Sequence, residues 1–430
     1  MAVDAMQWNA LLATQAESNP FMRHEYLAAL HLSHAACPQT GWTPRTVTLW
    51  RGEAMVGACA VYLKAHSYGE YVFDWAWANA YQQHGLSYYP KAVVAVPFTP
   101  VPGARLLARS AQDREALARG LIAWCRQEKL SSLHMLFANE DDVVAAQSAG
   151  MMLRNTVQFH WTNLTPAPLA APPAQTLQAV TLSPDGADFF RDAASTNCPL
   201  PDRMFRSFDD FLASLSQEKR KKIRQERRKV ADAGVSFRSM QGTSIGQRDW
   251  AFFYRCYERT YLEHGNAPYL SPNFFERMAD TMPDNWLLFI AQQNGQDIAS
   301  SLIAITAHGD RPTDPPAKRI AYGRYWGALK RVDCLHFEAC YYQPLQWCIE
   351  HRYHRFEGGA QGEHKMARAL MPVKTSSAHW LAHPAFSDAI ERFLEREGTG
   401  IESYMTELSD RSPFRQLRQP AESMDDLLRQ

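Results

Sequence analysis

The order of the predicted secondary-structure elements repeats along the chain, and this repeat constrains the fold more than any single motif. In the first half, the hydrophobic pattern predicts a hairpin, a strand, an amphipathic helix and a further strand, at residues 45–64, 93–98, 112–128 and 132–137. The second half predicts the same four elements in the same order, at residues 286–306, 320–327, 335–350 and 353–356. The two sets are displaced by roughly 220 to 240 residues. We therefore predict two α/β domains of like architecture, each with its own sheet, in place of one large sheet.

The composition between the two halves indicates a linker. Residues 166–174 contain four prolines and four alanines, so we place a linker at 166–176. The predicted N-terminal domain then spans residues 1–165. The predicted C-terminal domain spans residues 177–410, carries a basic helix at 217–230 and is followed by a polar tail at 411–430.

The overall composition is that of a globular protein and excludes some partners. Hydrophobic residues make up 46% of the 430 residues, which is enough for a substantial core. The formal net charge is zero, so an anionic partner has to be met by a local patch. The sequence has neither a signal-peptide pattern nor a run of about 18 apolar residues, and we expect a soluble, cytoplasmic protein without integral membrane association. The eight cysteines form no Cys-x-x-Cys pair, so we expect reduced core thiols and no metal site.

Residues 356–368, Phe-Glu-Gly-Gly-Ala-Gln-Gly-Glu-His-Lys-Met-Ala-Arg, form the segment that says most about function. Its three glycines disfavour a helix or a packed strand, and they permit positive φ and close approach of the backbone to another group. The segment follows a predicted strand, and the end of a strand is a usual ligand position in α/β proteins. An ordinary solvated turn with surface charges is the alternative interpretation.

A second candidate segment is rich in aromatic side chains. Eight of them occur between residues 68 and 89, and Glu70 and Asp74 lie among them. Two carboxylates beside Trp75 and Trp77 are suited to line a pocket for a cationic or amine group. A place in the core or at a domain interface is the alternative for the same residues.

The third candidate is a strongly basic helix. Residues 217–229 contain eight basic side chains and two acidic ones. This density favours contact with phosphate or RNA, for which the candidate residues are Lys219, Arg220, Lys222, Arg224, Arg227 and Arg228. A solvated, highly charged helix is the alternative interpretation.

Taken together, several motifs resemble the FemAB-like family, described as peptidoglycan biosynthesis or recognition proteins and related to GNAT-type N-acyltransferases. The resemblance extends from about residue 24 to about residue 394, and its most specific parts are residues 68–77, 89–91, 96–101, 322–327 and 356–365. It implies an α/β fold built as a tandem pair of GNAT-like domains. It also implies a donor that is either aminoacyl-tRNA, as in Fem transferases, or acyl-CoA, as in ordinary GNAT enzymes.

The loop that follows residue 327 bears on the choice of donor. GNAT enzymes hold the pyrophosphate of acyl-CoA on backbone N–H groups of a glycine-rich loop between a strand and a helix. The corresponding residues here, 328–334, contain no glycine, and residues 98–105 of the first half are rich in proline. This departure disfavours acyl-CoA and leaves aminoacyl-tRNA as a donor, with the basic helix as a possible tRNA contact.

Acyl transfer to an amine needs a base, a group that stabilises the oxyanion, and charges that position the substrates. We expect Glu357 or His364 to act as the base and the backbone N–H groups of Gly358 and Gly359 to stabilise the oxyanion. Further substrate contacts are expected from Arg324, Tyr325, Gln361, Lys365, Arg368 and Lys374, and contacts to the amine from Glu70, Asp74, Trp75 and Trp77. A structural salt-bridge network is the alternative for these residues.

These observations predict a transferase that moves an aminoacyl or acyl group to an amine, on a peptidoglycan or other cell-envelope precursor. No tightly bound cofactor is expected beyond the donor, because the sequence has neither a Rossmann fingerprint nor a P-loop. Two alternatives stay open. One is an acyl-CoA-dependent N-acetyltransferase that acts on a small amine, and the other is a non-catalytic protein that binds RNA or a cell-wall precursor.

Overall fold

The computed structural model describes residues 3–165, 203–307, 318–360 and 362–415. The elements of the first half are α1 (Ala5–Ala13), α2 (His24–Leu32), β1 (Trp42–Arg51), β2 (Ala54–Lys64), α3 (Trp75–Gln83), β3 (Lys91–Val94), β4 (Leu107–Ala108), α4 (Ala111–Gln127), β5 (Ser132–Ala138), α5 (Glu140–Ser148) and β6 (Met152–Thr162). The predicted hairpin, strand, helix and strand are β1 with β2, β3, α4 and β5, so this order is confirmed.

The second half repeats the order. Its elements are α6 (Phe208–Ser214), α7 (Gln217–Asp232), β7 (Val235–Gln241), α8 (Gln247–Glu263), α9 (Pro272–Thr281), β8 (Trp286–Gln293), β9 (Gln296–Ile305), β10 (Ile320–Ala328), α10 (Leu335–Phe337), the π-helical turn η5 (Glu338–Tyr342), α11 (Gln343–Glu350), β11 (Arg355–Ala360), the 3₁₀ turn η6 (Glu363–Arg368), β12 (Met371–Leu381) and α12 (Pro384–Asp410). The second predicted set corresponds to β8 with β9, β10, the helical segment 335–350 and β11.

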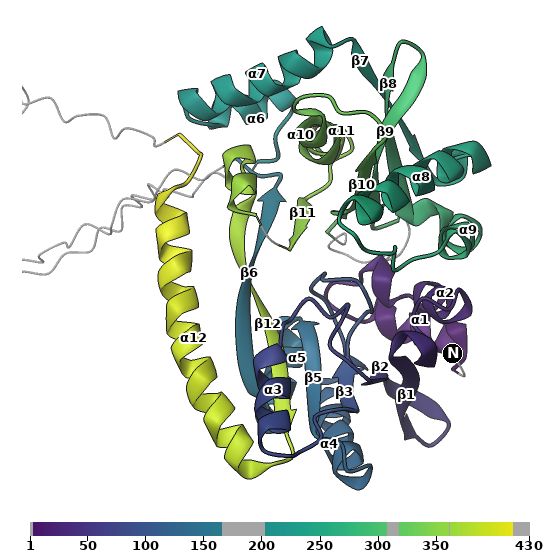
Figure 1. Cartoon of the computed structure of the whole chain (residues 1–430), viewed down its shortest axis with the longest axis vertical. Coiled ribbons are helices and arrows are strands. Elements are labelled where there is room, and N and C mark those ends of the chain that lie inside the picture. The colour runs from purple at the N-terminus through teal and green to yellow at the C-terminus, as the bar shows by residue number, and fades with distance from the viewer. Residues whose placement is uncertain (1–2, 166–202, 308–317, 361, 416–430) are drawn as a thin grey trace, which may run out of the picture.

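The strands of both halves join one sheet in the order β1-β2-β3-β5-β12-β6-β11-β10-β9-β8-β7, and β4 pairs with β2. The order is nearly symmetric about its middle, because each side contains one parallel pair, β3 with β5 and β10 with β11. The prediction of two separate sheets is wrong, since β6 and β12 pair with each other and join the halves. Figure 1 shows these two long strands running between the lower and the upper half.

The long strands β6 and β12 each pair across the boundary that the sequence suggested. β6 belongs to the predicted N-terminal domain 1–165 and pairs with β11 of the second half. β12 belongs to the predicted C-terminal domain 177–410 and pairs with β5 of the first half. The β6–β12 register runs from the Met371–His160 pair to the His379–Met152 pair. Strand pairing therefore does not stop at the predicted domain bounds, and the bounds themselves stay a prediction.

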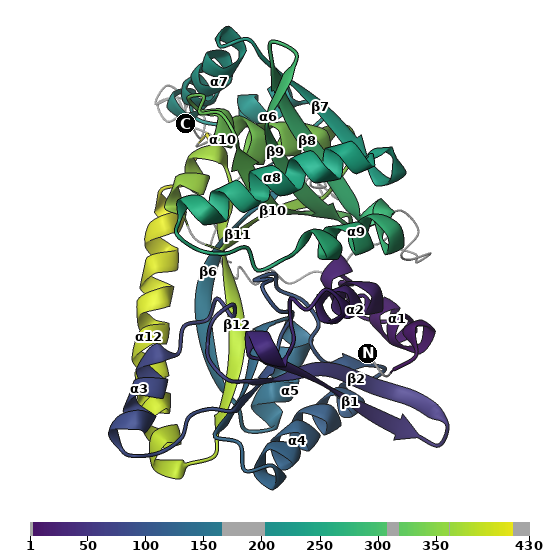
Figure 2. The same cartoon turned by 45° about the vertical axis from the view of Figure 1, so that its right-hand side comes forward.

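Helices cover the faces of this sheet (Figures 1 and 2). In the second half, α8 covers one face and places Phe253 in the same buried cluster as Leu302 of β9. The opposite face is covered by α11, whose Leu345 is buried with Ile303 of β9. The long α12 lies along β6 and β12 and buries Leu394. Each face of the second half thus has its own apolar core.

Local sequence explains why the elements begin and end where they do. In α4, the Ser110 side chain accepts a hydrogen bond from the backbone N–H of Asp113, which caps the first turn. Leu117, Leu121 and Cys125 follow at four-residue spacing and are buried. This stripe packs toward β2 and buries the apolar face of the helix.

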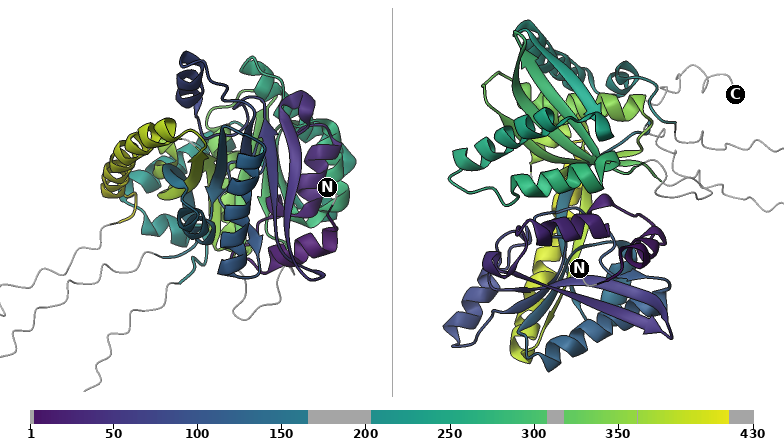
Figure 3. Two further views of the ribbon diagram at one scale, coloured as in Figure 1. Left: turned by 90° about the horizontal axis from the view of Figure 1, so that it is seen from below. Right: turned by 90° about the vertical axis from the view of Figure 1, so that its right-hand side faces the viewer.

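The two halves contact each other through aromatic side chains near the ends of α2 and α9. The ring of Phe21 meets the ring of Tyr322 edge to face, with the centroids 5.3 Å apart. Phe98 stacks on Tyr269 with the centroids 4.7 Å apart. The right-hand view of Figure 3 shows the halves one above the other, and α2 packs against α9 where they meet.

Some expectations concern membranes, metals and segments without described structure. Within the described residues, no helix combines the length and the apolar character needed to cross a bilayer. The same residues hold no group of three or more His, Cys, Asp or Glu side chains arranged for a metal ion. The predicted linker 166–176 lies outside the described residues, as does the tail beyond residue 415.

Candidate active site where β10 and β11 diverge

The parallel strands β10 and β11 stay paired over a short distance and then separate. They pair at Ile320 with Arg355, at the next two positions, and no further in the described chain. Immediately beyond, the pairing of β10 with β9 shifts register between Gly323 and Tyr325, so Arg324 is an extra residue in a β-bulge. A cavity of about 130 Å³ opens at this point.

The cavity is walled by β9, β10, β11 and the helical segment that follows β10. Its lining combines an apolar surface with one thiol, one imidazole, one guanidinium and several hydroxyl groups, from Ser301, Ile303, Gly323, Arg324, Tyr325, Trp326, His336, Cys340, Tyr341, Phe356 and Gly358. A cavity in which apolar side chains meet several convergent polar groups is a candidate small-molecule site.

The glycines at 358 and 359 lie within β11, so the prediction that they form a turn after the strand is wrong. The pairing of β11 with β6 shifts register between Glu357 and Ala360, and the two glycines form this irregularity. Gly359 adopts a φ of +77°, and a Cβ on Gly358 would lie 2.4 Å from Cδ2 of Leu370. Positive φ and close approach were predicted, and both are confirmed, but the close neighbour is the protein's own core.

Glu357 points to the face of the sheet opposite the cavity, because neighbouring residues of a strand alternate in direction. It is 3% exposed and accepts a hydrogen bond from Nε of Arg355 at 2.9 Å. Arg355 also binds Glu17 of the first half, with 2.7 Å between Nη2 and Oε2. Burial raises the pKa of Glu357 to about 7. The second carboxylate oxygen lies 3.9 Å from Nε2 of His160.

Three of the four ionisable residues after the glycines, His364, Lys365 and Arg368, have different surroundings. His364 is exposed, and its Nε2 lies 3.4 Å from the hydroxyl of Tyr341. Lys365 is buried and donates to the carbonyl of Gly359 at 2.9 Å, and burial lowers its pKa to about 8. Arg368 is buried, lies 3.5 Å from the ring centroid of Phe337, and pairs with a glutamate of the basic helix. These contacts hold η6 against the cavity wall.

The other predicted substrate contacts are dispersed. Arg324 and Tyr325 line the cavity, and Nη2 of Arg324 donates to the carbonyl of Phe98 at 3.0 Å. Lys374 is exposed on β12, outside the cavity lining. Gln361 lies outside the described residues.

Glu70 and Asp74 bind an amine, as the sequence suggested, but the amine belongs to the protein. Nζ of Lys91 lies 2.8 Å from Oε2 of Glu70 and forms a still shorter contact with Asp74. Both carboxylates and the lysine are buried in the first half. The lysine and its hydrogen bonds give these groups a structural role, and we assign them no substrate. Trp77 is buried as well, whereas Trp75 is 38% exposed and contacts Tyr68.

The basic helix is confirmed as α7, and its cations fall into two groups. Arg227 binds Glu338 of η5, with 3.0 Å between Nη2 and Oε1, so it fixes the helix to the cavity wall. The others face solvent in part or fully, as Lys219, Arg220, Lys221, Lys222, Arg224, Arg228 and Lys229. At its end, Val230 is buried with Leu335 beside the loop after β10. The exposed cations therefore lie on a helix that reaches this loop.

The loop after β10, residues 329–334, leads into the helical segment that lines the cavity. Cys334 adopts a φ of +65°, which non-glycine residues rarely do. Lys330 and Arg331 are exposed there. The loop thus presents two exposed cations beside the end of β10.

Sequence reasoning missed the residues that the helical segment contributes to the cavity. His336, Cys340 and Tyr341 all line it. The helix at 335–350 was predicted, but a helical pattern does not say which turn faces an opening in the neighbouring sheet. Glu338 to Tyr342 form a π-helical turn, a feature that is often found at functional sites and leaves no clear sequence signal.

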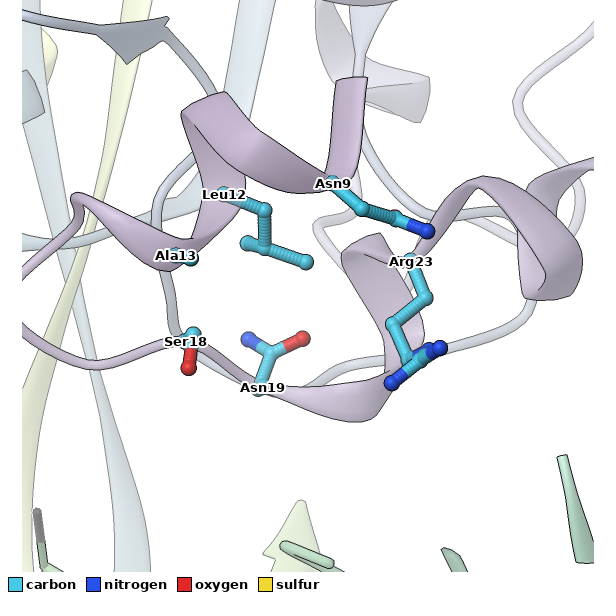
Figure 4. Close-up of a pocket in the computed structure, with 6 residues that line it drawn as sticks. All are labelled: Asn9, Leu12, Ala13, Ser18, Asn19 and Arg23. Atoms are coloured by element: carbon cyan, nitrogen blue, oxygen red, sulfur yellow. The ribbon is translucent and has the colours of Figure 1, made fainter. Parts of the chain in front are cut away.

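A second, smaller pocket lies in the first half, between α1 and the residues that lead into α2 (Figure 4). Its volume is about 40 Å³, and it is lined by Asn9, Leu12, Ala13, Ser18, Asn19 and Arg23. Asn19 caps the turn Pro20–Met22, and Asn9 donates to Glu25. With room for about one water molecule and its amides already paired, we assign it no function.

Comparison with solved structures supports this description of the fold. FemX has 10% sequence identity over 91% of this chain and 99% of its own, with a TM-score of 0.50. L-PGS from Bacillus licheniformis has 9% identity over 91% and 97%, with a TM-score of 0.49. A tandem GNAT protein from the clavulanic acid biosynthesis pathway has 13% identity over 88% and 95%, with a TM-score of 0.40. The likeness to FemX shows a shared mixed α/β fold and, at this identity, no more.

No curated protein matches the sequence significantly. A family model does, over residues 1–167 and 190–416, and it describes peptidoglycan biosynthesis or recognition proteins. The match includes both parallel pairs, the cavity and the basic helix. The resemblance drawn from the sequence motifs is therefore confirmed, and the chain belongs to the FemAB-like family.

Proposed function

We propose that this protein transfers an aminoacyl or acyl group to an amine, and that the cavity between β10 and β11 holds the acyl end of the donor. The observation that carries the proposal is the divergence of this parallel pair. Beyond Tyr322, the edge of β10 that faces β11 has no strand partner in the described chain. Backbone N–H groups on that edge are available to an acyl carbonyl, and one well-placed donor contributes about 3 to 4 kcal/mol to the stability of an oxyanion.

The charge around the cavity supports aminoacyl-tRNA as the donor. A tRNA would bring its acyl end to the cavity and its phosphates to the surface beside it. The exposed cations of α7 lie on a helix whose C-terminal end packs beside the loop after β10, and this loop carries the exposed Lys330 and Arg331. Acyl-CoA is less well matched, because residues 328–334 lack the glycines that let a backbone wrap a pyrophosphate.

The acceptor in this proposal is an amine of a peptidoglycan or other cell-envelope precursor, and the reaction is cytoplasmic because charged tRNA is found there. The description of the family supports this acceptor class. Of the predicted catalytic pair, His364 stays in the proposal through its contact with a cavity residue. Glu357 faces the other side of the sheet, so we no longer propose it as the base.

Thermal stabilisation by ligands tests the proposal directly. Aminoacyl-tRNA, uncharged tRNA, acetyl-CoA and a UDP-linked muropeptide are compared on the same protein, because a ligand at one hundred times its Kd stabilises the folded state by about 2.7 kcal/mol. Stabilisation and transfer with aminoacyl-tRNA support the proposal. Stabilisation by acetyl-CoA alone would indicate that acyl-CoA is the donor in place of aminoacyl-tRNA. Binding without any transfer would indicate a non-catalytic binding protein.

A pair of variants tests whether the acyl group binds in the cavity. Ser301→Leu fills the cavity, and we expect transfer to be lost and tRNA binding to α7 to persist. Ser300→Ala changes the neighbouring buried residue on the opposite face of β9 and serves as the control. Full transfer activity in Ser301→Leu would show that the acyl group binds elsewhere.

A further inference from the structure

One tyrosine connects the cavity to the protein surface. Tyr341 lines the cavity and is 5% exposed. Its hydroxyl lies 3.4 Å from Nε2 of His364, and the two rings meet edge to face. His364 is itself exposed to solvent. A path of two side chains therefore runs from the cavity through Tyr341 and His364 to bulk water.

The turn that carries Tyr341 is held from outside the cavity. It is the π-helical turn η5, and its first residue, Glu338, binds Arg227 of α7. The hydroxyl of the last residue, Tyr342, donates to Glu226 of the same helix. Because both ends of the turn are bound to α7, the residue between them is fixed in its direction toward the cavity.

Charged and titratable groups from several elements surround His364. On its own turn η6, Lys365 and Arg368 approach it, and burial together with these two cations lowers the pKa of its imidazole. His336 of α10 is a further neighbour, and burial lowers its pKa to about 4. The carboxylates nearby are bound by other partners, Glu226 by Arg368 and Glu363 by Tyr404 of α12. These surroundings favour the uncharged imidazole of His364, whose Nε2 can accept a hydrogen bond.

We propose that Tyr341 is a catalytic residue that passes a proton from the acceptor amine to His364, and that His364 passes it to solvent. This inference rests on the proposed function, because it needs an acyl donor in the cavity. The ammonium of the acceptor gives one proton to the oxygen of Tyr341 while the hydroxyl proton of Tyr341 moves to Nε2 of His364. The neutral amine then attacks the acyl carbon, so an N–C bond forms. The ester C–O bond breaks, and the leaving ribose oxygen takes the second proton of the attacking nitrogen.

The test uses Tyr341→Phe, His364→Gln and the double variant of the full-length protein, with aminoacyl-tRNA and an amine acceptor. A proton-transfer group contributes about 10²- to 10⁴-fold to a rate, so we expect kcat to fall at least 10²-fold in each single variant with KM for the donor nearly unchanged. The double variant is expected to fall no further, because both residues serve one step. Tyr81→Phe, which changes a buried tyrosine of the first half, is the control. Full kcat in Tyr341→Phe, or additive losses in the double variant, would overturn the proposal.

A second readout separates this inference from the proposed function. In ¹⁵N NMR of the wild type, His364 should carry its proton on Nδ1 at neutral pH, because Tyr341 donates to Nε2. Tyr341→Phe should shift this tautomer toward Nε2–H whether or not transfer is observed. An unchanged His364 spectrum in Tyr341→Phe would refute the relay. A changed spectrum in a protein that transfers nothing with any donor would refute the proposed function instead.

Discussion

Both halves contain a parallel strand pair, and the cavity described above lies where the pair of the second half diverges. β3 and β5 pair at three positions, as β10 and β11 do. Beyond Val94, however, the loop after β3 turns back onto β5, where the N–H of Gly103 donates to the carbonyl of Phe137 at 3.1 Å. The buried side chains of Val72, Ala95 and Leu136 fill the space.

Two local features account for this difference. In the first half, Arg105 is buried and its Nε donates to the carbonyl of Leu136 at 2.8 Å, so the loop is fastened across the divergence. In the second half, β10 continues past the divergence as far as Ala328 and leaves that edge of the strand unpaired in the described chain. The same strand order therefore gives a closed core in one half and a site in the other.

The largest expected effect comes from a substitution in the first half, where the loop after β3 closes the parallel pair of β3 and β5. Arg105→Ala removes a buried side chain and leaves the carbonyls of Val101 and Leu136 without their donor, so we expect a loss of about 3 to 5 kcal/mol of unfolding free energy. Chemical denaturation measures the loss. Arg109→Ala, at an exposed position, should change stability by less than about 0.5 kcal/mol. Equal stabilities of the two variants would mean that Arg105 does not hold the loop.

The second prediction compares one glycine from each divergence. A Cβ at Gly103 would lie 2.1 Å from Nδ2 of Asn19, and at Gly358 it would lie 2.4 Å from Cδ2 of Leu370. We expect Gly103→Ala and Gly358→Ala each to destabilise the protein by about 1 to 3 kcal/mol through overpacking. Transfer activity, measured at a temperature where both variants are folded, should fall only in Gly358→Ala, because that glycine lines the cavity.

The third prediction concerns pH and the buried carboxyl beside the site. Burial raises the pKa of Glu357 from its usual 4.5 to about 7, so the folded state holds this proton where the unfolded state has lost it. The contribution of Glu357 to stability therefore decreases as pH rises from about 4.5 through about 7. Glu357→Gln removes this dependence, and relative to wild type its unfolding free energy should rise between pH 5 and pH 7.5 by about 1 to 2 kcal/mol.

Denaturation at both pH values is the measurement for that prediction. Glu391→Gln, at an exposed position on α12, provides the control and should follow the wild type. If Glu357→Gln also follows the wild type at both values, the carboxyl is not protonated in the folded protein.

The smallest expected effect on stability comes from substitutions in the basic helix α7, and these test whether α7 contacts tRNA. Lys222→Ala and Arg224→Ala each remove an exposed cation, so we expect weaker tRNA binding. The slope of the logarithm of the binding constant against the logarithm of salt concentration should become smaller in magnitude by about one per cation removed. The unfolding free energy should stay within about 0.5 kcal/mol of wild type. Arg227→Ala removes an ion pair to Glu338 and should instead lower stability. Binding curves at several salt concentrations separate the two classes. Equal salt slopes for all variants would remove α7 from the proposed tRNA contact.

Much of the architecture was readable in the sequence because it depends on local patterns. The amphipathic spacing of α4 and the strand-like apolar runs of the two hairpins predicted element type and order, and the basic density of residues 217–229 predicted a charged helix. The pairing of β6 with β11 and of β12 with β5, each across the two halves, could not be predicted from the sequence. Both strands have patterns that fit either neighbour, and strand order depends on contacts between residues more than 200 positions apart, such as Met371 and His160.

The same distinction applies to the candidate site. The sequence located the glycines, the cations of residues 364–368 and the strand that contains Arg324, because each has an unusual local composition. It did not give their directions. Glu357 faces away from the cavity because β11 continues past it as a strand, and Glu70 is bound to Lys91, a partner 21 residues away that no spacing rule predicts.

By itself, the sequence determined the kinds of elements, their repeated order and the family, since these depend on local periodicity and on motifs of adjacent residues. Only the tertiary structure decided that one parallel pair is closed by Arg105 and its loop and that the other is open beside Tyr341. The physical reason is that a cavity is the space left unfilled where several segments, distant in the sequence, pack against one another. Local sequence fixes the shape of each segment, and the packing of all of them decides where space remains.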